Sequence, residues 1–270
     1  MEQFITEQEW NHISEEGRQA IAVAISKDRN EADYQIINPP NAFYVSVGKS
    51  FLDFLLGLIG CIVFLPINLF IAVITFFDVG NPIFFQQPRV GKNGKLFCMV
   101  KFRNMTNKTN EDGILLPPEQ RVTRWGRIVR SMSLDELLNF WSVLKGDMSI
   151  IGPRPLPQKY AVRFSKYHQQ RHLVRPGLEC PFHEHGLVKQ GWQGRLDNDV
   201  WYVEHLSFKT DIMMAFLLVK KVFSKQERAA SASGKTGEFI GYNEDGSVMN
   251  EWEIPRKYLS VAEESEVEIA

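Results

Sequence analysis

One hydrophobic segment, Phe51 to Phe77, limits what this chain can fold into more than any other feature. It contains more than the roughly 20 apolar residues that a membrane-spanning helix needs, so hydropathy alone predicts a transmembrane helix. Pro66 lies near its middle, and a proline inside a helix removes a backbone hydrogen bond and bends the helix. Lys49 and Asp53 lie at its start, where both could stay at the membrane surface if the segment dips in and returns. The residues themselves leave both the spanning and the re-entrant topology open.

Charge separates the middle of the chain from its ends. The 270 residues carry a formal net charge of -1. Basic residues nevertheless far outnumber acidic ones between Pro88 and Arg175, whereas residues 1–40 and 226–270 are rich in acid. A basic middle is typical of a protein with an anionic partner: a nucleotide, a lipid phosphate, a membrane surface or a nucleic acid. The hydrophobic content of 44% is enough for the core of one catalytic domain with tails.

A polar turn before the apolar run 137–144 carries the clearest chemical signal. Ser133-Leu-Asp-Glu136 fits a capping box, with Ser133 as N-cap and Glu136 as its third helical residue. A helix start also offers free amides and a positive dipole end, which bind phosphate. Neighbouring helical residues point about 100° apart, so Asp135 and Glu136 suit separate tasks, one attacking and one holding a cation. A purely structural cap and a phosphate site both remain open on this pattern.

Basic residues flank this turn: Arg121, Arg124, Arg127 and Arg130 upstream, and Lys145 and Arg154 downstream. Single basic residues usually belong to a solvated face. Arg154 differs because prolines on both sides fix its backbone, and a rigid guanidinium suits bidentate recognition of phosphate.

Three blocks of sequence resemble a known family. They are KFRNM at Lys101–Met105, VRSMSLDELLNFWSVLKGDMSIIGPRPLP at Val129–Pro157, and RPG at Arg175–Gly177. Together they closely resemble the bacterial sugar transferases called small monotopic phosphoglycosyl transferases. The resemblance covers roughly Lys49 to Lys225.

The resemblance implies an activity and a set of site residues. The expected reaction moves a sugar 1-phosphate from a UDP-sugar to a membrane polyprenyl phosphate, giving a polyprenyl diphosphate sugar and UMP. This is the first membrane step of bacterial polysaccharide, capsule or glycoconjugate synthesis. Asp135 is the expected nucleophile, forming a covalent phosphosugar intermediate, and Glu136 the expected ligand of Mg²⁺. The expected substrate-binding residues are Lys101, Arg103, Arg130, Arg154, Arg175 and Asp211.

It also implies a fold and a location. We expect an α+β protein, mostly helical, with a re-entrant membrane helix broken at Pro66, a small β-hairpin and interfacial amphipathic helices. Residues 49–225 form the expected transferase domain, with residues 49–80 as the membrane helix, between extensions 1–48 and 226–270. The catalytic domain is expected on the cytoplasmic face of the bacterial inner membrane, in contact with lipids and without nucleic acid. A homodimer is left open.

Local patterns predict several elements. Asn93-Gly94 indicates a two-residue hairpin turn within Ile83–Lys101, which would place Lys101 and Arg103 at the end of the second strand, directed toward the predicted helix that begins at Ser133. Asn198–Phe223 is predicted to be a helix at a membrane surface. Asp211 within it either matches a family aspartate or caps the helix. The segment after Pro157 carries an aromatic stripe, formed by Tyr160, Phe164 and Tyr167. Whether this stripe belongs to the core or anchors the chain at a membrane is left open.

One segment departs from the family. Leu178–Gln190 replaces a GWAQVNGR-like stretch, and Leu187 stands where the family has an arginine, with Lys189 and Arg195 as candidates to replace it. Cys180, His183 and His185 invite a metal site. Their C-x-x-H-x-H spacing is not a standard zinc spacing and no fourth ligand is evident, which favours a reshaped substrate loop.

The chain ends carry weaker signals. Thr6 to Glu9 is a second capping box, leading into a predicted helix over Trp10–Ile25. The absence of a basic n-region argues against a cleaved signal peptide. Ser233-Gly-Lys-Thr236 lacks the first glycine of a phosphate loop. The chain has an odd number of cysteines and no C-x-x-C pair; the three are Cys61, Cys98 and Cys180. This pattern favours reduced thiols in a cytosol-facing protein.

The sequence leaves two other functions open. A non-enzymatic membrane adaptor would bind anionic lipid through the basic middle and keep its function in Asp135→Asn. A membrane phosphatase with an aspartate nucleophile would release phosphate without an acceptor lipid. The lack of a D-x-D pair at Asp135 argues against the phosphatase.

Overall fold

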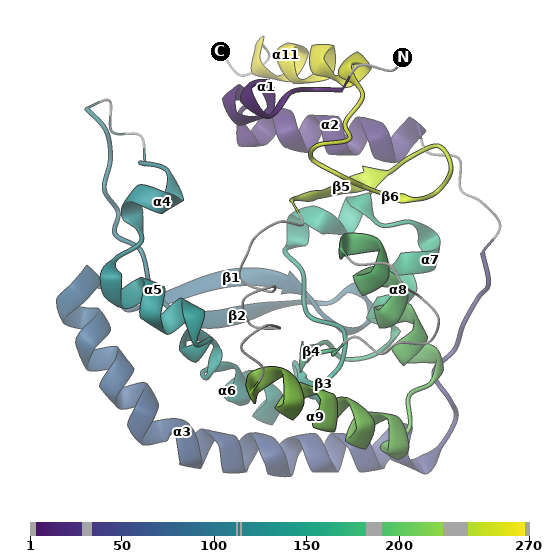
Figure 1. The fold of residues 1–270 in the computed structure, drawn as a ribbon. Coiled ribbons are helices and arrows are strands. Elements are labelled where there is room, and N and C mark those ends of the chain that lie inside the picture. The colour runs from purple at the N-terminus through teal and green to yellow at the C-terminus, as the bar shows by residue number, and fades with distance from the viewer. Residues whose placement is uncertain are drawn as a thin grey trace.

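The membrane-length segment forms one long helix. The computed structural model describes residues 4–28, 34–111, 113, 115–181, 191–223 and 237–267. Helix α3 runs over Lys49–Val79 and follows a π-helical turn at Tyr44–Gly48. In Figure 1 it follows the lower edge of the molecule and then turns upward. Within the described ranges, Tyr44–Val79 is the single helical segment long and apolar enough to cross a membrane.

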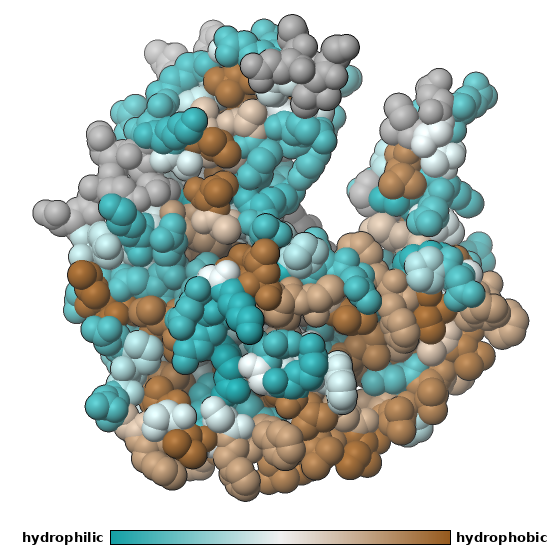
Figure 2. All heavy atoms as spheres, turned by 180° about the vertical axis from the view of Figure 1, so that it is seen from behind, coloured by the Kyte–Doolittle hydropathy of each residue, from teal (hydrophilic) through white to brown (hydrophobic). Residues whose placement is uncertain are grey.

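The outward face of α3 is apolar. Phe51, Ile62, Phe70 and Phe77 are among its large exposed side chains. Figure 2 shows hydrophobic side chains gathered along this edge of the molecule. The sequence predicted a break at Pro66, but helical structure continues through it. A proline costs one backbone hydrogen bond, and a helix can bend there without ending.

A close approach joins α3 to the short helix α6 (Asn139–Leu144). A Cβ added at Gly60 would lie 2.1 Å from Phe140 Cδ1, and one at Gly57 would lie 2.9 Å from the Leu144 amide nitrogen. Only glycine fits at these two positions without a shift of α6. Because α6 directly follows the turn Leu134–Glu136, here called the acidic turn, this contact fixes the acidic turn relative to α3.

The predicted hairpin is confirmed, with a different turn. Strands β1 (Phe84–Val90) and β2 (Leu96–Phe102) pair antiparallel, and Val90 lies opposite Leu96. Residues 91–95 therefore form the connection, which is longer than the expected two-residue turn. Asn93 and Gly94 do adopt positive φ, 55° and 76°. The Asn-Gly pair signals left-handed residues, which longer hairpin loops also use.

The capping box predicted at Ser133 does not form. Ser133 has a left-handed backbone (φ 55°, ψ 25°) and its side chain makes no capping hydrogen bond. A 3₁₀ turn at Leu134–Glu136 follows, and α6 begins only at Asn139. The Glu136 side chain binds two cations instead of reaching back to the Ser133 amide. Tertiary ion pairs therefore override the local pattern.

Short elements connect these parts. They are α4 (Pro118–Arg121), α5 (Arg124–Ser131), strand β3 (Ser149–Ile151) with its parallel partner β4 (Gly177–Glu179), the 3₁₀ turn Gln158–Arg163, α7 (Lys166–Gln169) and the 3₁₀ turn Gln170–Leu173. Helices and two-stranded sheets are thus mixed, in agreement with the predicted α+β class.

The helix predicted over Asn198–Phe223 is two helices. They are α8 (Gly191–Glu204) and α9 (Phe208–Phe223). The second one starts where Ser207 Oγ accepts a hydrogen bond from the Thr210 amide at 3.2 Å, a local cap that interrupts the apolar run.

The two ends of the chain fold together. We call residues 4–28 and 237–267 the terminal module. It contains α1 (Glu7–His12), α2 (Glu15–Asp28), β5 (Phe239–Tyr242), β6 (Val248–Asn250) and α11 (Leu259–Val267), drawn together at the top of Figure 1. Its core includes Ile21, Ile240 and Ile254, all fully buried. The capping box at Thr6 is confirmed.

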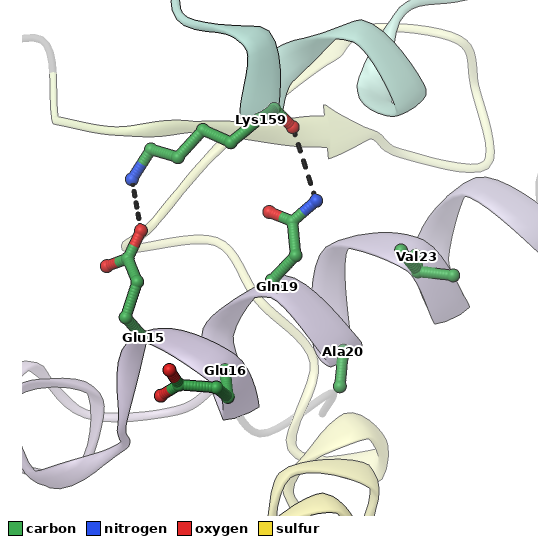
Figure 3. A pocket seen from close by; sticks show the side chains of 6 residues that line it. All are labelled: Glu15, Glu16, Gln19, Ala20, Val23 and Lys159. Carbon is green, nitrogen blue, oxygen red and sulfur yellow. Dashed lines mark hydrogen bonds and ion pairs between the residues drawn. The ribbon is translucent and has the colours of Figure 1, made fainter. Parts of the chain in front are cut away.

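The terminal module docks on the 3₁₀ turn Gln158–Arg163. Lys159 Nζ lies 2.7 Å from a Glu15 carboxylate oxygen, and Gln19 donates to the Lys159 carbonyl at 3.3 Å (Figure 3). Tyr160 and Phe164 contact Phe239 of β5 and are buried in this junction. These two aromatic residues are therefore core.

Candidate active site

Three segments far apart in sequence meet at Glu136. Its Oε1 accepts a hydrogen bond from Lys101 Nζ at 2.7 Å and another from the guanidinium of Arg154. Lys101 lies near the end of β2, and Arg154 lies in the turn after β3. The hairpin, the acidic turn and the proline-flanked turn thus form one cluster.

Glu136 is ionised in this cluster. Burial alone would raise its pKa, but the charges of Arg154 and Lys101 outweigh burial and lower the pKa to about 2. The carboxylate therefore stays negative at any physiological pH, and its charge is balanced by two cations.

Asp135 has a different environment. Its side chain is buried, 6% exposed. Among the described residues, no side chain donates a hydrogen bond to its carboxylate or forms an ion pair with it, and a hydrogen bond from its own backbone acts to lower its pKa. Burial raises its pKa, Lys101 acts in the opposite direction, and the negative charge of Glu136 raises it further. A buried carboxylate without a side-chain partner, next to a carboxylate whose charge two cations balance, is suited to attack an electrophile.

Two predicted basic residues lie near the turn but make other contacts. Arg130 donates to the Asn104 side chain at 3.2 Å, and its charge acts on Asp135. Arg103 donates to the backbone carbonyls of Val79, the last residue of α3, and of Asn81, just beyond it. Arg103 therefore ties the end of the hairpin to α3, and its role toward substrate stays a prediction.

Arg175 and Asp211 lie at the other end of α3. Arg175 is 3.2 Å from Asp53, and Asp211 is 2.7 Å from Lys49 Nζ and accepts hydrogen bonds from two tyrosines, Tyr44 and Tyr202. None of these partners contacts Glu136. Asp211 is therefore more than a helix cap, because it binds one lysine and two tyrosines from other segments. The role of Asp211 toward substrate stays a prediction.

Sequence reasoning missed two arginines that surround Arg154. Arg171 donates to the Arg154 carbonyl at 2.8 Å, and Arg89 donates to the Pro155 carbonyl at 3.1 Å. Burial and the charge of Arg154 lower the pKa of Arg89 to about 10. Nothing in the sequence separates these two residues from the other basic residues of the middle region, because their importance comes from tertiary contacts.

The sequence raises two candidate metal sites, one for Mg²⁺ at Glu136 and one at Cys180, His183 and His185. Two neighbouring carboxylates fit Mg²⁺, which binds through one or two carboxylates together with substrate phosphates and water. Glu136 Oε1 is taken by cations, which leaves Oε2 and the Asp135 carboxylate as oxygen donors. Among the described residues there is no group of three or more His, Cys, Asp or Glu that could hold an ion. His183 and His185 lie outside the described residues, as do Leu187, Lys189 and the segment 233–236.

Comparison with known proteins decides the family. Residues 44–225 match the family described as bacterial sugar transferase. The chain belongs to this family. The prediction made from the three sequence blocks is therefore confirmed, and the terminal module lies outside the matched range.

Three relatives illustrate what this sugar transferase resembles. The uncharacterized sugar transferase EpsL of Bacillus subtilis (strain 168) is 40% identical over 156 residues, covering 58% of this chain and 77% of EpsL. A UDP-N-acetylgalactosamine-undecaprenyl-phosphate N-acetylgalactosaminephosphotransferase of Aeromonas hydrophila is 31% identical over 193 residues, covering 68% of this chain and 45% of the relative. A UDP-glucose:undecaprenyl-phosphate glucose-1-phosphate transferase of Klebsiella pneumoniae is 34% identical over 193 residues, covering 66% and 40%. This chain spans less than half of the latter two.

Proposed function

We propose that this sugar transferase moves a sugar 1-phosphate from a UDP-sugar to a membrane polyprenyl phosphate and releases UMP. The observation that carries the proposal is the buried Asp135 carboxylate, which has no side-chain partner and lies next to Glu136, whose carboxylate Lys101 and Arg154 hold. The names of the Aeromonas and Klebsiella relatives support both substrate classes.

The proposed chemistry has two displacements at one phosphorus. An Asp135 oxygen attacks the phosphorus that bears the sugar, the bond from that phosphorus to the bridging oxygen breaks, and UMP leaves with the electron pair. An oxygen of the lipid phosphate then attacks the same phosphorus and releases Asp135 as a free carboxylate. Lys101 and Arg154 stabilise phosphoryl oxygens as negative charge develops, and Glu136 keeps both cations in place.

Mg²⁺, when bound through the free oxygens of the two carboxylates, would neutralise the diphosphate and the departing UMP. Asp135 and the two cations bind and orient the phosphates. Burial of Asp135 keeps its carboxylate poorly hydrated, so that little bound water has to be removed before the carboxylate attacks phosphorus.

We propose a re-entrant position for α3 on the cytoplasmic face of the bacterial inner membrane. Contacts between segments before and after α3 support it: Gln19 accepts a hydrogen bond from Arg163 at 3.0 Å, and Ile37 donates to Gln170 at 2.6 Å. A spanning helix would put the partners of each contact on opposite sides of the bilayer. Both ends of α3 therefore belong on one side, where a soluble nucleotide and a lipid headgroup can meet.

The activity is tested with purified protein, polyprenyl phosphate, Mg²⁺ and a panel of UDP-sugars, measuring UMP. Asp135→Asn should lose turnover and the covalent phosphosugar adduct seen by intact mass, and should still fold. Asp147→Asn, which breaks an exposed ion pair with Lys145, is the matched control and should keep activity. Turnover by Asp135→Asn equal to the parent would reject the mechanism. Phosphate release without acceptor lipid would support the phosphatase, and lipid binding without any turnover would support the adaptor.

Topology is tested with an impermeant thiol reagent on cells. Cysteines introduced at Ser14, before α3, and at Ser131, after it, should be protected from the outside and become labelled together once the inner membrane is opened. Labelling of one from outside and the other only from inside would show that α3 spans. A homodimer stays a prediction.

A further inference from the structure

Arg154 lies in a turn that lacks backbone N–H donors of its own at several positions. Pro153, Pro155 and Pro157 surround it, and a proline has no backbone N–H to donate to a strand ladder or a turn. The carbonyls of the turn must therefore be fixed from outside. Gly177 N donates to the Pro153 carbonyl at 3.0 Å, which fixes the start of the turn.

The Arg154 carbonyl is fixed by a buried ion pair. Arg171 and Asp199 are each 1% exposed. Asp199 Oδ2 accepts from Arg171 Nε at 3.0 Å and from Nη2 at 2.6 Å, and the same Nη2 donates to the Arg154 carbonyl at 2.8 Å. On the next residue, Arg89 binds the Pro155 carbonyl.

The side chain of Arg154 is held at its other end. One guanidinium nitrogen donates to the Leu178 carbonyl at 3.0 Å and the other binds Glu136. The backbone of Arg154 is thus bound by Arg171, which Asp199 of α8 holds in turn. Its side chain is bound by β4 and by the acidic turn.

A buried ion pair of this kind is poor evidence of stability alone, because removing both charges from water costs several kcal/mol. Its geometry offers a specific benefit here. The planar guanidinium of Arg171 makes three directed bonds, and a lysine cannot place donors along all three directions.

We propose that the Arg171–Asp199 pair is a positioning element that sets the place of the Arg154 guanidinium beside Glu136, and thereby the affinity of the site for the diphosphate of the activated sugar. The inference rests on the proposed function. Neither residue contacts Glu136, so both act through Arg154.

The test compares two buried arginines with similar surroundings. Arg163 is also 1% exposed and binds one carboxylate, that of Glu238, together with a carbonyl, that of Phe239, but it contacts the terminal module and not Arg154. Arg171→Lys should lower kcat/KM for the UDP-sugar and weaken binding of UDP, measured by calorimetry, by roughly ten- to a hundredfold. Arg163→Lys should lose a similar amount of Tm and keep both values close to those of the parent.

A double-mutant cycle separates positioning from general damage. In an Arg154→Ala background, Arg171→Lys should have no further effect on UDP affinity, because its target is gone. If Arg171→Lys does not fold, Asp199→Asn serves in the same cycle, since it keeps the shape and removes the charge that orients Arg171.

The outcomes distinguish the two claims. Equal kinetic losses in the Arg163 and Arg171 variants, or additive losses in the cycle, with an active parent, would overturn the positioning role and leave the function intact. A parent that neither turns over UDP-sugars nor binds UDP would reject the proposed function and this inference with it.

Discussion

Replacing Glu136 with glutamine isolates the charge at the centre of the cluster. Glutamine keeps the size and one acceptor oxygen of the side chain and removes its negative charge. Lys101 and Arg154 then face each other without the carboxylate that both bind. We expect Glu136→Gln to destabilise the protein at neutral pH and to abolish turnover.

The structure gives the size of the effect. A fall of the Glu136 pKa from its ordinary 4.5 to about 2 corresponds to about 3–4 kcal/mol, at roughly 1.4 kcal/mol for each pKa unit. The side chain is 20% exposed, and solvent screens part of this interaction, so this value is an upper limit.

The sign follows from the direction of the pKa. Because the folded protein lowers the pKa of Glu136, its contribution to stability is fully present above pH 4.5. It disappears as the pH falls toward about 2. The stability difference between the parent and Glu136→Gln should therefore shrink over this acidic range.

Urea unfolding in detergent micelles measures this difference. Asp147→Asn is the control, because its partner Lys145 is exposed and such pairs contribute about 1 kcal/mol at most. Two results would refute the reasoning: equal stability of parent and Glu136→Gln at neutral pH, or a difference that stays constant down to about pH 2.

Three further predictions follow from other parts of the molecule. Asp135→Asn should be at least as stable as the parent at neutral pH, because burial raises the pKa of Asp135 and its ionised form therefore costs stability. This gain in stability should vanish below the ordinary pKa of 3.8, which thermal unfolding at several pH values would measure. Phe239→Ala removes a fully buried ring from the junction with the terminal module and should cost about 3–5 kcal/mol; faster hydrogen exchange across residues 237–250 checks it, and unchanged exchange contradicts it. Gly60→Ala drives a methyl group into Phe140 and should cost about 1–3 kcal/mol, measured as a lower Tm, with no loss expected if α6 moved freely.

Local patterns predicted elements well where the local chain decides the outcome. The hairpin over β1 and β2 depends on an Asn-Gly pair and flanking strand residues, and it is present. The capping box at Thr6 depends on four consecutive residues at an exposed helix start, and it forms. Its counterpart at Ser133 fails because Glu136 has stronger partners, Lys101 and Arg154, which lie far from it in sequence.

The contacts that organise the site could not be read from spacing. Trp10 binds Glu251 across 241 positions of sequence, so the joining of the two chain ends has no local signature. Arg171 and Arg89 look like any other basic residues of the middle region. Their role follows from the prolines around Arg154, which leave carbonyls that distant side chains must bind.

Helix α3 and the candidate active site are held together by contacts along the whole helix. The charged residues at the start of α3 are turned inward: Lys49 binds Asp211, and Asp53 accepts from Ser149 Oγ at 2.9 Å. At the other end, Arg103 binds the carbonyl of Val79, the last residue of the helix, and that of Asn81 just beyond it. Between these anchors, Gly57 and Gly60 admit α6, which follows the Asp135 turn. Since both ends of α3 are tied to the polar body and α6 packs on its middle, Asp135 is held at a fixed position relative to the apolar face of α3.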